Sequence, residues 1–135
     1  PICLDETIVS IRAAEQAIRA GACKFINIKP GRIGGLYNSI AVHDLAKEEG
    51  IPVWVGGMLE SAVGGSICIE LATLDNFTYP GDLLPSCRFY EHDLATPPTE
   101  LTQELTFKPY GVERPVPDPA RLRKQTLRYK TISSK

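Results

Sequence analysis

The sequence predicts an α/β fold in which short parallel strands alternate with helices. Apolar runs of strand length recur along the first 93 residues, amphipathic or apolar helical patterns separate them, and polar or glycine-rich loops follow them. Parallel strands need a crossover connection, usually a helix, so this alternation is typical of βα units on one sheet. We therefore expect strand–helix units up to residue 93 and a different organisation beyond it.

The first expected elements have clear start and stop signals. The apolar run at residues 1–4 ends at an acidic pair, and Ser10 is a suitable N-cap for a helix over residues 11–21. A second strand is expected over residues 24–29. A second helix then begins near residue 36 and ends at Gly50, because glycine commonly closes a helix.

The next elements carry weaker signals. Residues 51–55 (IPVWV) predict a third strand, and a third helix is expected over residues 61–74 although two glycines lower its helix propensity. Residues 76–80 (NFTYP) predict a fourth strand. Each strand leads into a polar or glycine-rich loop, which is where enzymes built on parallel sheets place their active-site residues.

The chain changes character from residue 94. Prolines interrupt a segment with little periodicity, and basic residues outnumber acidic ones after residue 113. We expect residues 94–135 to form a tail, with one short helix followed by an edge strand over residues 122–135. Basic residues without interleaved aromatic residues do not favour nucleic-acid binding.

Composition excludes several classes of protein. The chain has 135 residues, 43% of them hydrophobic, and a net charge of −1, which is ordinary for a soluble domain and gives no reason to expect nucleic acid or membrane as a partner. No apolar run approaches the roughly 20 residues that span a bilayer. We expect Cys3, Cys23 and Cys68 to be buried free thiols in a reducing, cytoplasmic setting. Because the chain begins at Pro1 inside an expected strand, we also expect it to be part of a longer protein.

Two charged residues, Asp5 and Lys29, follow neighbouring expected strands. Side chains alternate along a strand, so Lys29 shares one face with Asn27 while the isoleucines on either side of Asn27 point the other way. A carboxylate at a strand end suits Mg²⁺, and a lysine beside a divalent cation can act as a base. Taken singly, the aspartate could instead be a helix cap or an ion-pair partner, and the lysine a member of an ion pair.

The motifs LDETI, INIKPGRIGGL and GIPVWVGGMLES, in that order and followed by NFTYPGD, closely resemble the enolase superfamily. Within it they resemble the muconate-lactonizing-enzyme subgroup, and best the o-succinylbenzoate synthases that are often also N-acylamino acid racemases. The resemblance runs over residues 1–93 and more loosely through 109–113. It implies the C-terminal half of a (β/α)₇β TIM-type barrel, with strands five to eight, in an enzyme that also has a capping domain.

The resemblance also implies roles for the two charged residues. Asp5 matches the third carboxylate ligand of Mg²⁺ (or another divalent cation such as Mn²⁺), and Lys29 matches the lysine of the sixth barrel strand. The family forms an enediolate by removing the proton next to a substrate carboxylate. Dehydration then yields o-succinylbenzoate for menaquinone synthesis, whereas racemisation returns the proton to either face.

Further positions follow from the same resemblance. Gly57, Met58, Leu59 and Glu60 match the loop that lines the distal part of the substrate, although Met58 could equally serve packing.

Three further residues are expected to lie around Asp5 and Lys29 and to support them without contacting the substrate. Asn27 could hydrogen-bond Asp5 or Lys29, or simply fill the barrel; Arg32 follows the lysine and adds charge near it; Glu6 points away from Asp5 on a regular strand and could pair with a lysine. His43 and Asp44 lie on an expected helix outside the barrel and are interpreted as structural.

The absences are as informative as the matches. The chain supplies neither the second-strand lysine, nor the first two metal ligands, nor the capping domain, and a full barrel needs about 250 residues. We expect the chain alone to be inactive, with a small carboxylate substrate and the missing N-terminal part of the enzyme as partners, and a homo-oligomeric assembly. The alternatives are a non-catalytic half-barrel that self-associates through unpaired edges, and a muconate cycloisomerase or dipeptide epimerase relative.

Overall fold

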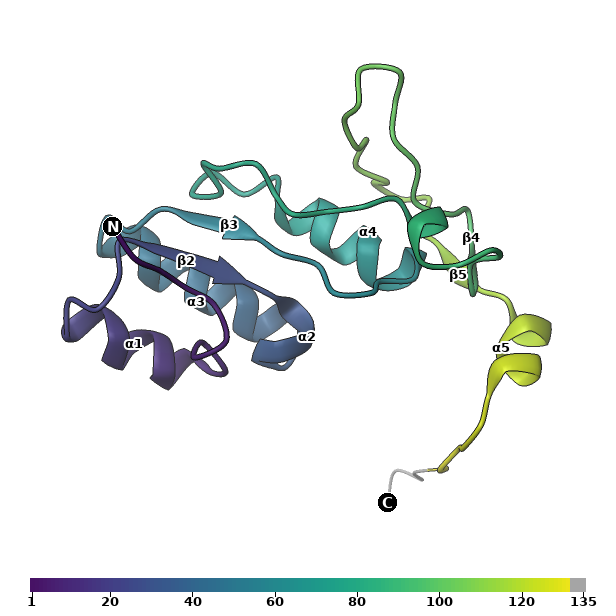
Figure 1. The fold of residues 1–135 in the computed structure, drawn as a ribbon, viewed down its shortest axis with the longest axis horizontal. Helices are drawn as coiled ribbons and strands as arrows, with labels where there is room; N and C mark the ends of the chain where they lie inside the picture. The colour runs from purple at the N-terminus through teal and green to yellow at the C-terminus, as the bar shows by residue number, and fades with distance from the viewer. Residues whose placement is uncertain (132–135) are drawn as a thin grey trace.

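The computed structural model describes residues 1–131, and it contains a small parallel sheet with helices packed on one face (Figure 1). The sheet order is β1 (Cys3–Leu4), β2 (Phe25–Ile28) and β3 (Val53–Val55). Both pairings are parallel. Chain order therefore equals spatial order, as expected for consecutive strands of a TIM-type barrel.

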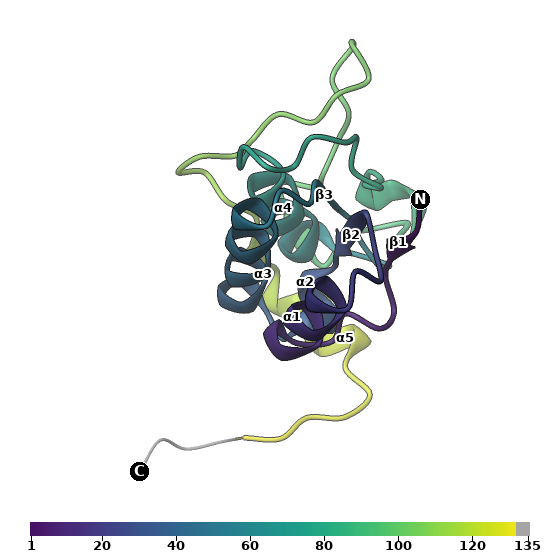
Figure 2. The ribbon, with the colours of Figure 1, turned by 90° about the vertical axis from the view of Figure 1, so that its left-hand side faces the viewer.

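Helices connect the strands and cover one face of the sheet. α1 (Ile11–Arg19), α3 (Leu36–Glu48) and α4 (Ala62–Leu71) lie on the same side of the strands (Figure 2). A short helix, α2 (Pro30–Ile33), stands between β2 and α3. The predicted alternation of strands and helices is thus confirmed, whereas α2 was not predicted, because its four residues are too few for a periodic pattern.

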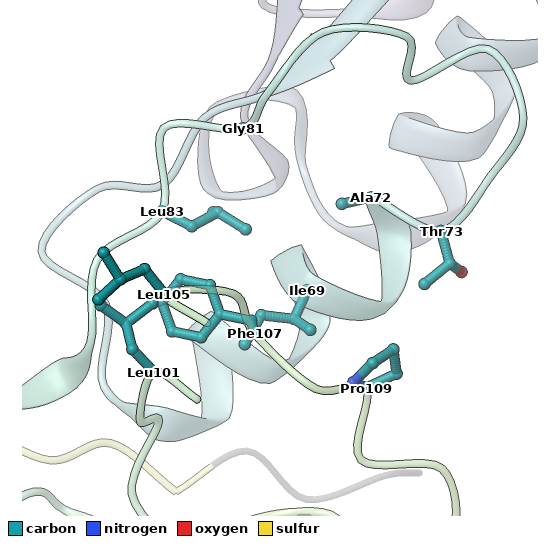
Figure 3. A pocket seen from close by; sticks show the side chains of 9 residues that line it. All are labelled: Ile69, Ala72, Thr73, Gly81, Leu83, Leu101, Leu105, Phe107 and Pro109. Atoms are coloured by element: carbon teal, nitrogen blue, oxygen red, sulfur yellow. The ribbon is translucent and has the colours of Figure 1, made fainter. Parts of the chain in front are cut away.

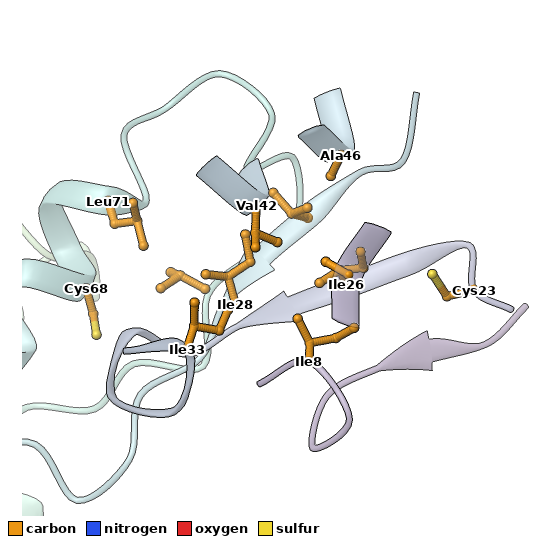
Figure 4. Close-up of a cluster of buried hydrophobic side chains, with 12 residues drawn as sticks. Ile8, Cys23, Ile26, Ile28, Ile33, Val42, Ala46, Cys68 and Leu71 are labelled. Carbon is orange, nitrogen blue, oxygen red and sulfur yellow. The ribbon is translucent and has the colours of Figure 1, made fainter. Parts of the chain in front are cut away.

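The core lies between the sheet and these helices (Figure 4). Ile26 and Ile28 of β2 are fully buried on the helix-facing side, and Val53 and Val55 of β3 are their neighbours in the sheet. The helices contribute Ala14, Ile33, Val42, Ala46, Cys68 and Leu71, and the connecting segments add Ile8 and Cys23. Because strand side chains alternate, this packing turns Asn27 and Trp54 to the opposite face.

The fourth strand expected over residues 76–80 is not formed. Single parallel bridges join Val53 of β3 to Phe77 and Gly56, just after β3, to Asp82. Between these bridges the chain advances five residues on one side and three on the other, so the segment bulges out of register. Pro80 also lacks the backbone N–H that a continuous ladder would need.

The tail contains a second, antiparallel pair of strands that was not predicted. β4 (Ala95–Thr96) pairs with β5 (Val116–Pro117), and α5 (Pro119–Gln125) follows. The expected short helix is therefore present, slightly earlier in the chain. Residues 126–131 form no strand, since no described segment pairs with them, and residues 132–135 lie outside the described residues.

Asp93, which the sequence did not single out, ties the tail to α4. This carboxylate lies beyond the short 3₁₀ helix η1 (Ser86–Arg88), is 7% exposed, and accepts hydrogen bonds from the backbone N–H of Ala62 at 2.9 and 3.1 Å. It also accepts from the N–H of Ala95 at 2.9 Å, and Arg121 donates to its backbone carbonyl at 2.7 Å. Asp93 thus caps α4 from 31 residues away.

A second carboxylate on α4 holds a later part of the tail. Glu70 accepts hydrogen bonds from the backbone N–H groups of Tyr110 and Gly111, at 2.7 and 2.9 Å. The tail is therefore fastened to both ends of the same helix. The division between a barrel part and a tail at residue 93 stays a prediction.

The cysteines and the helix lengths give two further results. All four cysteines are free; Cys23 and Cys68 are buried as expected, and burial raises the pKa of Cys68 to about 12. Cys3 is exposed, which corrects the prediction that it would be buried: it lies on the sheet face that the described helices do not cover.

Within residues 1–131, no helix is both long and apolar enough to cross a membrane.

Replacing Asp93 by alanine is expected to destabilise the chain by about 2 kcal/mol, because the buried N–H of Ala62 loses its acceptor and α4 loses its cap. Asp118→Ala is the matched control: Asp118 caps the exposed helix α5 through Ala120 and Arg121, so its loss should matter much less. Urea unfolding followed by circular dichroism measures both. Equal effects would contradict the anchoring role of Asp93.

Candidate active site

The two charged residues singled out by sequence meet at the C-terminal ends of adjacent strands. Leu4 of β1 is paired with Ile26 of β2, so the chain segments that follow these strands run side by side. Lys29 Nζ lies 3.4 Å from Asp5 Oδ2, and Arg32 Nη1 donates to Asp5 Oδ1. The carboxylate therefore faces two cations, all three side chains being largely buried.

The turn after β2 explains how one short segment supplies both cations. Pro30 occupies the first position of α2, where its missing N–H costs nothing. The carbonyl of Lys29 accepts from the N–H groups of Arg32 and Ile33 at 2.9 and 3.1 Å, which fixes Arg32 one turn beyond the lysine. Gly34 closes α2 with φ of 95°, a left-handed conformation that favours glycine.

Electrostatics keep Asp5 ionised. Burial would raise its pKa, but the hydrogen bond from Arg32 and the charge of that guanidinium outweigh burial, and Asn27 and Lys29 add smaller contributions in the same direction. The net result is a pKa below the usual value of 3.8. At neutral pH this site therefore presents a carboxylate anion and not a carboxylic acid.

Gly56, the residue after β3, leaves the space that Lys29 occupies. A Cβ atom at this position would lie 2.7 Å from Lys29 Cε and 2.6 Å from Asn27 Oδ1, both closer than real contacts. The backbone N–H of Gly56 meanwhile donates to Ile28 at 3.0 Å. The glycine after the third strand thus serves the lysine on the second.

The loop at residues 57–60 follows directly. Met58 and Leu59 are 56% and 71% exposed, so neither packs in the core of the described residues. Glu60 turns back and accepts from the N–H of Met58 at 3.2 Å, while Tyr90 donates its hydroxyl to the carbonyl of Leu59 at 2.8 Å. Tyr90 was missed by sequence reasoning, because a long-range contact to a backbone carbonyl leaves no local pattern.

Below the charged groups, the same sheet face carries an aromatic layer. Phe25 and Tyr79 meet edge to face with ring centroids 5.0 Å apart, and Trp54 Nε1 donates to Cys3 Sγ at 3.2 Å. These side chains come from the strands and from the bulged segment beyond β3. The polar groups therefore lie over an apolar floor.

The remaining sequence candidates lie apart from this cluster. Glu6 is exposed. His43 is buried on α3, where it stacks on Phe77, contacts Asp44 through Nδ1 at 2.8 Å, and accepts from the N–H of Asn76 through Nε2 at 3.2 Å. The contact of Nδ1 with a carboxylate and the use of Nε2 as an acceptor fit a neutral ring with its proton on Nδ1, and a structural role.

A cavity of about 420 Å³ lies elsewhere, between α4 and the tail (Figure 3). Its lining includes the apolar side chains of Ile69, Leu83, Leu101 and Phe107. None of the residues selected from the sequence lines it. Size alone therefore does not identify the site; the charged cluster at the strand ends does.

The residues present do not by themselves make a metal site. Asp5 has the hard oxygen ligands that Mg²⁺ prefers, but its oxygens face Arg32 and Lys29. Within residues 1–131, no group of three or more His, Cys, Asp or Glu side chains could hold a metal ion. Asp5 is at most one ligand of a larger set.

A family model for enolase C-terminal domain-like proteins matches residues 1–125. The chain belongs to this family. It is 54% identical over 97 residues to the N-succinylamino acid racemase of Amycolatopsis sp., a match that covers 72% of this chain and 26% of that protein. It is 48% identical over 120 residues to the o-succinylbenzoate synthase of Geobacillus kaustophilus, covering 84% of this chain and 32% of that protein.

Solved structures of family members agree on the fold. A probable mandelate racemase from Alicyclobacillus acidocaldarius superposes with a TM-score of 0.84 at 32% identity, covering 95% of this chain and 34% of that one. The dipeptide epimerase of Cytophaga hutchinsonii, solved with Mg and the dipeptide D-Ala-L-Val, gives 0.70 at 27% identity and covers 80% and 29%. The chain thus spans about a third or less of the length of its relatives, and the TIM-type fold class expected from the sequence is confirmed.

Replacing Asp5 by asparagine is expected to cost about 1–2 kcal/mol of stability at pH 7, because Lys29 and Arg32 lose their shared anion. The folded-state pKa of Asp5 is lowered, so its contribution is fully present above the unfolded pKa of about 4 and is lost as the pH falls through the folded value. The gap between wild type and Asp5→Asn should therefore shrink as unfolding is measured at successively lower pH.

Asp75→Asn provides the matched control, because the Lys47–Asp75 pair is exposed and contributes little. A cost for Asp5→Asn that stays constant from neutral to strongly acidic pH would contradict the ion-pair interpretation.

Proposed function

We propose that this chain carries part of the active site of an o-succinylbenzoate synthase or N-acylamino acid racemase, and that the rest of the site lies in an N-terminal part of the same enzyme. The observation that carries this proposal is the contact between Lys29 and Asp5 at the ends of adjacent strands. The chain is also 54% identical to an N-succinylamino acid racemase and 48% identical to an o-succinylbenzoate synthase over the matched residues. Parallel-strand barrels build their active sites at this end.

In this proposal Lys29 acts on the carbon next to a substrate carboxylate. In racemisation its amine removes a proton from one face of that carbon or returns it, while a second base on the other face does the reverse. In dehydration it remains an ammonium and stabilises the negative charge that develops on the substrate. The side chain of Lys29 is only 15% exposed. This burial limits competition from water and so strengthens the electrostatic interaction of Lys29 with the substrate.

Asp5 and Arg32 would support this chemistry, Asp5 by binding the metal ion and Arg32 by holding Asp5 in position. Asp5 would supply one carboxylate ligand to Mg²⁺, or to Mn²⁺, and the ion bound there would stabilise negative charge on the substrate carboxylate. The remaining ligands would come from the N-terminal part. Arg32 keeps Asp5 ionised and holds one of its oxygens in place.

The loop at residues 57–60 is proposed to line the distal part of the substrate. Its exposed Met58 and Leu59 offer apolar surface, and Tyr90 and Glu60 hold the loop backbone from either side. Gly57 is held in turn, because its N–H donates to the carbonyl of Asp82 at 3.0 Å. An acyl chain fits such a surface better than a charged group does.

The biological setting is part of the same proposal. Dehydration to o-succinylbenzoate would place the enzyme in menaquinone synthesis, and four free cysteines fit a reducing, cytoplasmic location. We further propose that the tail, whose exposed α5 carries Arg123 and Lys124, packs on the capping domain of the complete enzyme.

A chimera tests the proposal: this chain replaces the matching third of the Geobacillus kaustophilus o-succinylbenzoate synthase. The chimera is expected to catalyse Mg²⁺-dependent dehydration, measured by o-succinylbenzoate formation, or α-proton exchange of an N-succinylamino acid in D₂O, measured by NMR. Lys29→Ala should lower kcat by about 10³-fold or more, since it removes a proton-transfer group.

Lys24→Ala is the matched control, because Lys24 is exposed and precedes the same strand. It should leave both activities intact. A folded chimera that is inactive in both assays, or one that tolerates Lys29→Ala, would refute the proposed function. Activity only on muconate or on dipeptides would move the chain to the cycloisomerase or epimerase branch.

A second candidate is a non-catalytic half-barrel that self-associates. The observation that favours it is the edge of β1, which pairs with β2 alone among the described strands, next to Ile2 at 61% exposure. Unpaired edges recruit further strands. The same edge equally suits the N-terminal part of the enzyme, so it does not by itself favour self-association. The catalytic proposal is preferred because it also accounts for the contact between Lys29 and Asp5.

The isolated chain is therefore expected to self-associate through β1, and light scattering after size exclusion should give a mass above that of one chain. Ile2→Lys should shift the chain toward monomer, because a charge at an edge opposes pairing. Val112→Lys, at a 99% exposed tail position, is the control and should have no effect. A chain that is monomeric at all concentrations would remove the second candidate.

A further inference from the structure

The amide of Asn27 is buried on the sheet face that carries Lys29, and the catalytic proposal leaves it unused. Its side chain is 0% exposed, and within residues 1–131 neither its Oδ1 nor its Nδ2 has a hydrogen-bond partner. An unpaired buried polar group costs about 1–3 kcal/mol. A leucine, which has the same branched shape, would avoid that cost, so the asparagine calls for a physical reason.

Its neighbours suggest the reason. Asn27 lies on β2, and Lys29 follows the end of that strand with an extended backbone two residues later, so both side chains leave the same face. Both lean over Gly56: a Cβ there would lie 2.6 Å from Asn27 Oδ1, 2.8 Å from Asn27 Nδ2 and 2.7 Å from Lys29 Cε. The amide and the lysine stem therefore lie side by side in a space that the glycine keeps open.

Asp5 completes the arrangement. Asp5 contacts Lys29, whose stem lies beside the amide of Asn27, but no regular hydrogen bond joins Asp5 to that amide. The Lys29–Asp5 contact is also loose, at 3.4 Å. An amide has what this place needs, because its N–H can donate to the carboxylate while its oxygen accepts from the ammonium.

We propose that Asn27 is a positioning residue that orients Lys29 relative to Asp5. When Asp5 engages other cations in the complete site, Lys29 loses its anionic partner, and Asn27 Oδ1 is then the neutral acceptor that keeps its Nζ pointing toward the substrate. Leucine at this position has a similar shape but offers no hydrogen-bond acceptor to Lys29. This inference rests on the proposed function and deepens it.

The test compares Asn27→Leu with wild type in the chimera described above. The melting temperature should stay the same or rise, because a buried unpaired amide is removed, while kcat falls roughly tenfold or more and KM changes by less than about twofold. In a Lys29→Met background the same substitution should cause no further loss. Full kcat for a folded Asn27→Leu chimera would overturn the inference and leave the proposed function standing.

A second measurement does not depend on activity or on the leucine variant. In the present chain, the side-chain amide resonances of Asn27 should shift on Lys29→Met and on Asp5→Asn, but not on Lys24→Met at the exposed start of the strand. Resonances that ignore both of the first two substitutions would overturn the positioning role. An inactive wild-type chimera would instead refute the proposed function, and the two failures are thus distinguishable.

Discussion

The parallel pairing of β1 with β2 is the constraint on which the rest of the site depends. Leu4 opposite Ile26 sets the register, and that register alone brings the chain after β1 to the chain after β2. A slip of one residue would turn Lys29 toward the helices and Ile28 toward the open face. Because Ile26 and Ile28 are completely buried, the hydrophobic core opposes such a slip, and core packing thereby fixes the geometry of the charged groups.

The charged cluster in turn explains features that look unrelated to it. Three cation and anion groups can share a largely buried corner only if their charges compensate, and α2 supplies the second cation within one turn of the first. The space for the lysine comes from a third strand, through the missing side chain of Gly56. Elements far apart in the chain thus meet one requirement: a lysine held at a strand end with its charge balanced and its path clear.

How much of this could be read from the sequence differs from residue to residue. Ser10 predicted the start of α1 because capping is local: its hydroxyl oxygen accepts a hydrogen bond from the backbone N–H of Ala13, three residues away. Asp5 and Lys29 were found because strand ends and alternation are also local properties. Asp93 was missed because its partner Ala62 lies 31 residues earlier, and no local pattern marks a carboxylate that caps a distant helix. The prediction of a strand over residues 76–80 is wrong, since strand propensity does not reveal the mismatch of register with β3.

One face of the sheet is not covered by any described helix, and this open face carries the charged groups. Cys3 and Trp54 lie on that face together with a carboxylate and a lysine, and no described helix covers it. In a closed barrel such a face is the interior, where polar groups survive only if partners from other strands satisfy them. Within residues 1–131, Asn27 is buried on this face without a hydrogen-bond partner, whereas Asp5 is paired with Lys29 and Arg32. The unsatisfied amide of Asn27 on this face therefore supports the proposal that other parts of a longer enzyme complete the site.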